Sequence, residues 1–227
     1  MNLFDFVFPQ SCFGCGKRGN YICASCIERQ EATKPICPEC GRPTTRGMTH
    51  LRCRKQEGLD GLVSLWRYKG AVRRAIVSLK YKFAKKAAFE LAGHAEGYLA
   101  KQKIALPSKP TLVPIPLFWF RQHWRGFNQS EEVGKLLAEK IGWDFKPGII
   151  RRKISRPPQV QLRGRARRKN VDGVFAVNPQ VLVTIDKRPV ILFDDVWTTG
   201  ATIKEAAKVL KRNGASQVWG LTLALSR

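Results

Sequence analysis

The chain has 227 residues, a formal net charge of +24 and 44% hydrophobic residues. This length is enough for one well-packed core with a small appendage. No apolar run approaches the roughly 18 residues that cross a bilayer, which excludes a membrane-spanning helix. The amino terminus lacks a basic stretch and carries Asp5, so a signal peptide is not expected and the predicted location is the reducing cytoplasm.

All seven cysteines lie before residue 54, and they predict a metal-binding appendage over residues 1–58. They form three CxxC pairs, and the last cysteine repeats the same spacing with a histidine. Two intervening residues let one tight turn present both side chains to one ion, and Gly14, Gly16 and Gly41 suit such turns. Eight ligands suffice for two structural zinc ions: Cys12, Cys15, Cys23, Cys26, Cys37, Cys40, His50 and Cys53.

The eight ligands can be divided between the two zinc ions in two ways. We favour sequential sites, with the first four ligands on one ion and the last four on the other, and an interleaved arrangement stays open. A disulfide framework is disfavoured because it needs an oxidising compartment and normally an even number of cysteines. A lone histidine is more often a surface or capping residue, so only its distance from Cys53 makes His50 a candidate ligand.

Residues 59–227 have the pattern of one α/β domain. Apolar runs and turn residues predict strands at 62–68, 111–115, 174–177, 190–193 and 218–223. Helical spacing predicts mostly helix from 71 to about 101, and helices at 128–142 and 203–213. Strands separated by helices indicate a mostly parallel sheet, with the functional site at the carboxyl ends of the strands.

Residues 190–202 carry the clearest functional signal: an apolar strand, two acids, and a hydroxyl-and-glycine turn that opens a helix. Free N–H groups and the helix dipole attract an anion there, and Gly200 lets the backbone come close. The adjacent acids would repel a bare phosphate, so we expect them to face sugar hydroxyls or a hydrated magnesium ion. The pattern predicts a ribose 5-phosphate ligand, held by Asp194, Asp195, Thr198, Thr199, Gly200, Ala201 and Thr202.

The positive charge lies mainly outside the cysteine-rich segment. Residues 1–58 hold nine Lys or Arg and five acids, which leaves a net +20 on residues 59–227. Three acid-free stretches, 67–86, 118–127 and 145–171, combine cations with aromatic residues, a mixture that suits single-stranded nucleic acid because bases stack on aromatic rings at roughly 1–3 kcal/mol each. The residues expected to contact a strand are Trp119, Arg163, Arg165, Arg167, Arg168 and Lys169.

The strand, acid pair and Thr-Thr-Gly-x-Thr turn resemble the 5-phosphoribosyl 1-diphosphate (PRPP) signature of type I phosphoribosyltransferases. Two further segments, Val-Pro-Ile-Pro at 113–116 and Arg-Gly-Phe-Asn-Gln at 125–129, resemble motifs of the competence protein F (ComF) family, as does the stretch 159–175. Members of that family join an amino-terminal zinc ribbon to a phosphoribosyltransferase domain. The resemblance covers nearly the whole chain.

This resemblance implies a type I phosphoribosyltransferase fold that binds PRPP with Mg²⁺. It also implies a diphosphate-side loop and a mobile flap formed by Pro114, Pro116, Arg125, Gln159, Arg165 and Arg168. Two residues depart from the family pattern: His50 stands where the family usually has cysteine, and Trp197 where it usually has a small or branched residue. We expect Trp197 at the rim of the pocket, where its ring is a candidate stacking platform.

Two functions from different classes fit these features. The first is an enzyme that transfers phosphoribosyl from PRPP to an acceptor, with Asp194 and Asp195 as catalytic residues and a link to DNA uptake. The second is a non-catalytic competence protein that binds single-stranded DNA and uses the PRPP pocket for regulation. A competence helicase or other uptake proteins are possible partners. Nothing in the sequence specifies the acceptor.

Overall fold

The computed structural model describes residues 10–79, 84–102, 104–117, 127–153, 173–180 and 187–226. From residue 10 onward, the cysteine-rich segment contains two short helical pieces, α2 and η1. The elements, in chain order, are α2 (Ala24–Glu28), η1 (Leu51–Cys53), β1 (Gly61–Arg67), α3 (Gly70–Ser78), α4 (Ala84–Lys101), β2 (Thr111–Pro114), α6 (Gln129–Ile141), β3 (Asp144–Phe145), β4 (Ile150–Arg152), β5 (Phe175–Val177), β6 (Pro189–Trp197), α8 (Ala201–Arg212) and β7 (Gln217–Leu225).

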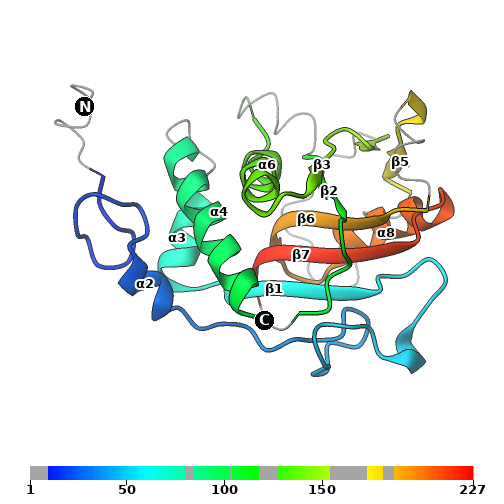
Figure 1. Ribbon diagram of the computed structural model, residues 1–227, viewed down its shortest axis with the longest axis horizontal. Coiled ribbons are helices and arrows are strands. Elements are labelled where there is room, and N and C mark those ends of the chain that lie inside the picture. Colours follow the sequence, from blue (N-terminus) through cyan, green and yellow to red (C-terminus); the bar gives the residue numbers. More distant parts are fainter. Residues whose placement is uncertain are drawn as a thin grey trace.

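Five parallel strands form the central sheet in the order β1-β7-β6-β2-β3 (Figure 1). The middle strand is β6, and its residues 190–193 are all fully buried. Ile191 and Phe193 belong to the core on one face of the sheet, while Val190 and Leu192 belong to the core on the other. Burial on both faces explains why this strand is a continuous apolar run and does not alternate.

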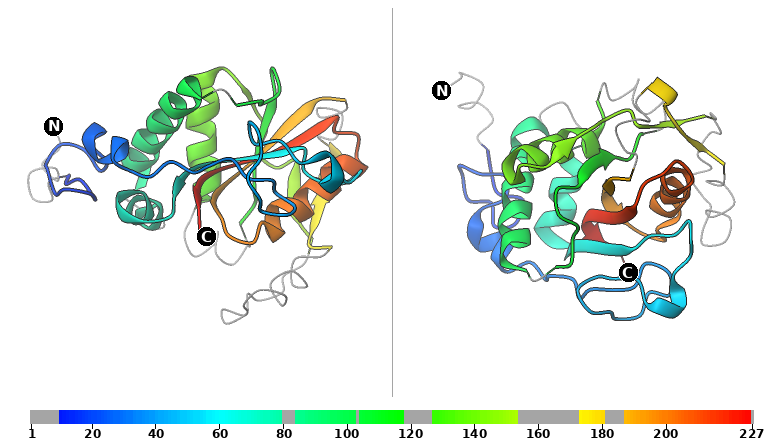
Figure 2. Two further views of the ribbon diagram at one scale, coloured as in Figure 1. Left: turned by 90° about the horizontal axis from the view of Figure 1, so that it is seen from below. Right: turned by 45° about the vertical axis from the view of Figure 1, so that its right-hand side comes forward.

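Helices cover both faces of the sheet. The views in Figures 1 and 2 show α3, α4 and α6 on one side and α8 with the β4–β5 hairpin on the other. The ends of α6 follow from its sequence. The Asn128 side chain accepts a hydrogen bond from the Ser130 N–H as an N-cap, and Gly142 closes the helix with a φ of 77°.

The cysteine-rich segment covers the exposed edge of β1. The Thr33 N–H donates to Leu65 O (3.0 Å), the Arg67 N–H donates to Glu31 O (2.9 Å), and the Leu62 N–H donates to Gly47 O (2.8 Å). An uncovered edge strand would present free backbone groups to other chains. The segment therefore completes the edge of the sheet at the same time as it forms its own metal-ligand clusters.

The predicted fold class, a mostly parallel α/β sheet with a small amino-terminal unit, is confirmed. Four details differ from the sequence-based expectation. The helical stretch from 71 forms two helices, α3 and α4, and α8 begins at Ala201, two residues earlier than predicted. The strand expected at 174–177 is β5, which pairs antiparallel with β4 outside the main sheet. Strands β3 and β4 were not predicted.

Candidate functional site

The turn between β6 and α8 lies at the carboxyl edge of the parallel sheet. Gly200 is the N-cap residue of α8 and has a φ of 73°, a conformation that favours glycine. A Cβ atom on Gly200 would lie 2.1 Å from Cζ2 of Trp197, so no other residue fits without displacement of that ring. Gly200 provides no side-chain cap and the first turn of α8 contains no acid, so the helix dipole favours an anion there. The Ala201 N–H makes a long bond of 3.4 Å to the Thr199 hydroxyl, which an anion would have to replace.

The two acids occupy the last part of β6, immediately before this turn. Asp194 is partly buried. Burial raises the pKa of its carboxyl to about 7, and the neighbouring Asp195 charge adds to the shift. Hydrogen bonds from the Asp195 N–H and the Ser130 hydroxyl, together with the charge of Arg152, act in the opposite direction. A site that binds magnesium or another cation here would favour the ionised form of this carboxyl.

Trp197 does not lie at the rim of a pocket, and that expectation was wrong. Its side chain is 1% exposed and belongs to the core cluster beneath the turn, which also contains Ile203. As the last residue of β6 it faces the layer formed by α8, where it fills the space under Gly200. Within the described residues, its Nε1 has no hydrogen-bond partner. Trp197 therefore supports the turn from below and is not a stacking platform.

The other predicted ligand residues divide into two groups. Pro114 ends β2 and pairs in register with Phe193, so it and the following Pro116 lie at the same edge of the sheet as the acids. The remaining residues predicted for the diphosphate loop, the flap and the nucleic-acid surface lie outside the described residues: Trp119, Arg125, Gln159, Arg163, Arg165, Arg167, Arg168 and Lys169.

The structure adds two residues to the site that the sequence analysis did not assign to it. The Ser130 hydroxyl donates to Asp194 Oδ1 at 2.9 Å from the start of α6. Arg152, at the end of β4, is close enough for its charge to influence Asp194, and its guanidinium lies over the Phe175 ring at 5.3 Å. In the sequence, Arg152 is one of many cations in an acid-free stretch, and Ser130 directly follows the segment 125–129 that resembles a family motif. Neither role is visible without the packing of α6 and β4 around β6.

The eight proposed metal ligands form two groups that follow the chain order. Cys12, Cys15, Cys23 and Cys26 form one group, and Cys37, Cys40, His50 and Cys53 form the other. Within each group, the candidate ligand atoms lie within 4.8 Å of one another. Four sulfur or nitrogen donors around one point match the tetrahedral coordination of zinc. Gly14 is required beside the first group, since a Cβ atom there would lie 2.4 Å from Cys26 Sγ.

The hydrogen bonds of His50 fit a metal ligand. Its Nε2 lies 3.0 Å from the Pro43 carbonyl oxygen, which only accepts, so Nε2 carries the proton. This leaves Nδ1 as the nitrogen that faces the cluster, where it lies 3.4 Å from Cys40 Sγ. A ligating histidine usually donates its other N–H to a carbonyl or carboxylate in this way. The second group is thus suited to zinc with three sulfur ligands and one nitrogen ligand.

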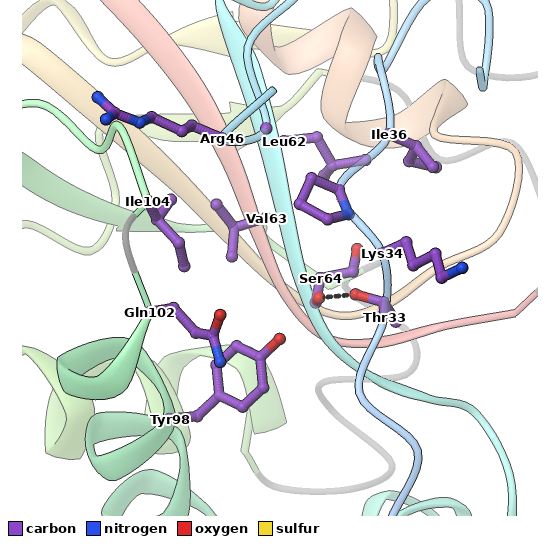
Figure 3. A pocket seen from close by; sticks show the side chains of 12 residues that line it. Thr33, Lys34, Ile36, Arg46, Leu62, Val63, Ser64, Tyr98, Gln102 and Ile104 are labelled. Atoms are coloured by element: carbon purple, nitrogen blue, oxygen red, sulfur yellow. Dashed lines mark hydrogen bonds between the residues drawn. The ribbon is translucent and has the colours of Figure 1, made fainter. Parts of the chain in front are cut away.

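A cavity of about 50 Å³ lies elsewhere, between the cysteine-rich segment and the sheet (Figure 3). Tyr98 and Gln102 from the end of α4 face it on one side, and Ser64 of β1, which accepts a hydrogen bond from the Thr33 hydroxyl, bounds it on the other. None of the predicted phosphate-site residues lines this cavity. The candidate phosphate site is therefore distinct from this cavity, and its described features are the backbone geometry of the turn and the two acids.

Comparison with known proteins places these features in one group of relatives. Residues 3–54 match the family model of the double zinc ribbon domain. The chain is 32% identical to the DNA utilization protein YhgH of Salmonella typhi, over 90% of this chain and 91% of that protein. It is 30% identical to competence protein F of Haemophilus influenzae, over 99% and 100%, and 28% identical to competence protein ComFC of Bacillus subtilis, over 90% and 84%.

Solved structures give more distant matches. The chain overlaps glutamine PRPP amidotransferase from B. subtilis with a TM-score of 0.42 at 13% identity, over 65% of this chain and 30% of that longer enzyme. It overlaps adenine phosphoribosyltransferase from Leishmania tarentolae with a TM-score of 0.38 at 14% identity, over 66% and 74%. Among the described residues, no helix is long and apolar enough to span a membrane.

Proposed function

Because this chain belongs to the competence protein F (ComF) family, we propose that its α/β domain binds PRPP with Mg²⁺ and transfers the phosphoribosyl group to an acceptor. The proposal assigns residues 1–58 to the double zinc ribbon and 59–227 to a type I phosphoribosyltransferase domain. It places the protein in the cytoplasm and links its activity to DNA uptake, in keeping with relatives that are named for DNA utilization and for competence. Zinc in the ribbon has a structural role.

The observation that carries this proposal is the acid pair followed directly by the glycine turn at the start of α8. The backbone N–H groups of residues 198–201 and the Thr202 hydroxyl would hold the 5-phosphate, which would displace the long Ala201 N–H bond to Thr199; the first turn of α8 contains no acid to repel it. Gly200 lets the phosphate approach the backbone. Asp194 and Asp195 would orient the ribose hydroxyls beside it.

The reaction would be displacement at C1 of the ribose, in which the C1–O bond to diphosphate breaks and a bond to the acceptor forms. The transition state resembles an oxocarbenium ion, so the carboxylates of Asp194 and Asp195 would stabilise its positive charge. Their oxygens are also the donors that Mg²⁺ prefers, and the ion would supply positive charge beside the departing diphosphate. Arg152 lies near enough to contribute a fixed cation.

A second function, single-stranded DNA binding with the PRPP pocket in a regulatory role, is favoured by the charge distribution. Residues 59–227 carry a net charge of +20, whereas a diphosphate site needs only about four or five cations. Exposed cations of α3 lie beside aromatic rings, as in the pair of Arg73 and Tyr68 at 6.0 Å. Both ligands are anions, so one protein could bind both.

Release of diphosphate separates the two functions. We would incubate the protein with PRPP, Mg²⁺ and a panel of purine and pyrimidine bases, and measure diphosphate. Release that depends on one acceptor and is lost in Asp195→Asn supports the enzyme. Absence of release with every acceptor, together with tight binding of single strands, supports the second function.

A further inference from the structure

Four hydrogen bonds join the end of β2, the start of α6 and the acid pair on β6 into a closed circuit. The Ile115 N–H donates to Phe193 O (2.9 Å), and Asn128 Nδ2 donates to Ile115 O (3.0 Å). The Ser130 N–H donates to Asn128 Oδ1 (3.1 Å), and the Ser130 hydroxyl donates to Asp194 Oδ1 (2.9 Å). The peptide bond between Phe193 and Asp194 closes the circuit.

Every member of this circuit except Asp194 is fully buried. Ser130 is 3% exposed, Asn128 5%, Ile115 4% and Phe193 0%. A buried polar group that loses its partner keeps its desolvation cost, so a circuit of this kind resists rearrangement. It fixes the carboxyl end of β2, which carries Pro114, relative to the acids of β6.

The two oxygens of Asp194 have different surroundings. Oδ1 accepts two hydrogen bonds, one from the Ser130 hydroxyl and one from the Asp195 N–H, each at 2.9 Å. Oδ2 has no hydrogen-bond partner among the residues that the structure describes. Two donors on a single oxygen fix the plane of the carboxyl group, because rotation about the Cβ–Cγ bond would break both bonds. The carboxyl group is thus held with Oδ1 occupied, while Oδ2 makes no hydrogen bond to the part of the chain that the structure describes.

We infer that Ser130 is a positioning residue, which holds Asp194 so that Oδ2 faces the ribose of PRPP. The inference rests on the proposed function and adds to it a residue from a different element. Ser130 itself does not touch the ligand. Its hydroxyl sets the orientation of the carboxyl group, and through Asn128 it keeps that group in a fixed relation to the end of β2. A serine that only begins a helix would have no effect on ligand affinity.

Ser130→Ala tests the inference by isothermal titration calorimetry with PRPP and Mg²⁺. The variant keeps the backbone bond to Asn128 and loses only the hydroxyl. We expect PRPP affinity to fall roughly tenfold or more, as for a hydrogen bond to a charged group. Ser130→Thr, which restores a hydroxyl, should recover affinity to within about threefold of wild type.

Ser64→Ala is the matched control. Ser64 is also buried, and its hydroxyl lies 2.8 Å from the Thr222 hydroxyl, between β1 and β7. Its loss removes one buried hydrogen bond of similar length. Thr222 pairs in register with Asp194, but the hydrogen bonds given for Asp194 come from Ser130 and Asp195, so PRPP affinity should stay at the wild-type value. Equal losses in Ser64→Ala and Ser130→Ala would assign both effects to stability alone and overturn the inference.

A double-mutant cycle identifies the partner. In an Asp194→Ala background, Ser130→Ala should change PRPP affinity less than about threefold, because the carboxyl group it orients is gone. Wild-type affinity in Ser130→Ala, or the same loss in both backgrounds, overturns the inference while the proposed function stands. No binding heat from the wild-type protein overturns the proposed function, and the inference with it.

Discussion

Gly200 meets two constraints that no other residue satisfies together. Its φ of 73° is strained for any side chain, and a Cβ atom would enter the Trp197 ring at 2.1 Å. We predict that Gly200→Ala destabilises the protein by about 1–3 kcal/mol, the usual cost of forcing atoms into a packed core. The variant should also lose the rise in melting temperature that PRPP causes, because the turn is displaced from the ligand.

Gly142→Ala provides the control for this prediction. Gly142 has a nearly equal φ of 77°, but a Cβ atom there would meet nothing within 4 Å. It shares the backbone strain and lacks the collision, so its destabilisation should be smaller and its response to PRPP intact. Equal melting temperatures for the two variants would mean that Trp197 does not constrain the turn.

The raised pKa of the Asp194 carboxyl group predicts how the stability of the protein depends on pH. Burial first, and then the Asp195 charge, raise its pKa from 3.8 to about 7 in the folded protein. In the unfolded chain the group ionises near its ordinary value, so between roughly pH 4 and 7 the folded state binds the extra proton. This contribution to stability is fully present below the unfolded pKa and is lost as pH rises through the folded pKa.

Asp194→Asn isolates this effect, because the amide does not ionise. We predict that the melting temperature of the wild type falls relative to that of Asp194→Asn as the pH is raised from 5 to 8, measured without ligand at constant salt. At pH 8 the variant should be the more stable protein, although it binds PRPP less well. A constant difference in melting temperature across this range would contradict the raised pKa.

At the scale of elements, α8 connects the phosphate turn to the second zinc-binding unit. Its amino end forms the turn, and three of its cations pair with acids of residues 37–60. Arg212 binds both oxygens of Glu57 at 2.7 Å. Lys211 lies 2.8 Å from Asp60, and Lys204 lies 3.5 Å from Glu39, between the ligands Cys37 and Cys40. These partly exposed pairs contribute modestly to stability, but together they fix the unit on the helix.

The zinc ligands give a prediction at the same scale. Purified under reducing conditions, the protein should contain about two zinc ions per chain, one for each ligand group. His50→Ala should lower the content toward about one, and His94→Ala should leave it unchanged, because His94 instead donates from Nε2 to the Ile22 carbonyl. Chelation should unfold the ribbon and leave the α/β domain folded. Two ions retained in His50→Ala would remove His50 from the site.

The sequence predicted the elements that depend on local pattern. The β6 run, the helix that begins near Asn128 and the glycine turn each follow from adjacent residues. The ligand spacing gave all eight ligand residues and favoured the sequential grouping that the structure has. Strands β3 and β4 were missed because two or three residues are too few for a periodic pattern. The burial of Trp197 depends on how α8 packs on β6, and the Ser130 contact with Asp194 depends on how α6 packs on β6. Residues far apart in the chain determine this packing, so a local pattern does not reveal it.

At the scale of the whole molecule, the charge excess predicts binding to single-stranded DNA through residues 59–227. The logarithm of the binding constant should fall with the logarithm of salt concentration, with a slope of about −0.7 for each phosphate contacted. Joint replacement of Arg165, Arg167 and Arg168 by Ala should reduce that slope by roughly one to two units. Trp119→Ala should weaken binding with little change of slope, because stacking releases no counterions.

Fluorescence anisotropy with labelled strands at several salt concentrations measures these slopes. The isolated zinc ribbon is the control, since it carries only +4 of the total charge. If the ribbon alone accounts for the binding, or if affinity is insensitive to the three arginines, the charge excess is an ordinary solvated surface.

The proposed function depends most on PRPP binding at the turn between β6 and α8. Calorimetric titration of the wild-type protein and Asp195→Asn with PRPP and Mg²⁺ measures it directly, with ribose 5-phosphate as a weaker reference ligand. We predict saturable binding of one PRPP to the wild type, weaker binding of ribose 5-phosphate, and no detectable binding to Asp195→Asn, which loses a carboxylate beside the ribose. A wild-type protein that gives no heat with millimolar PRPP, or an Asp195→Asn variant that binds equally well, would contradict the account.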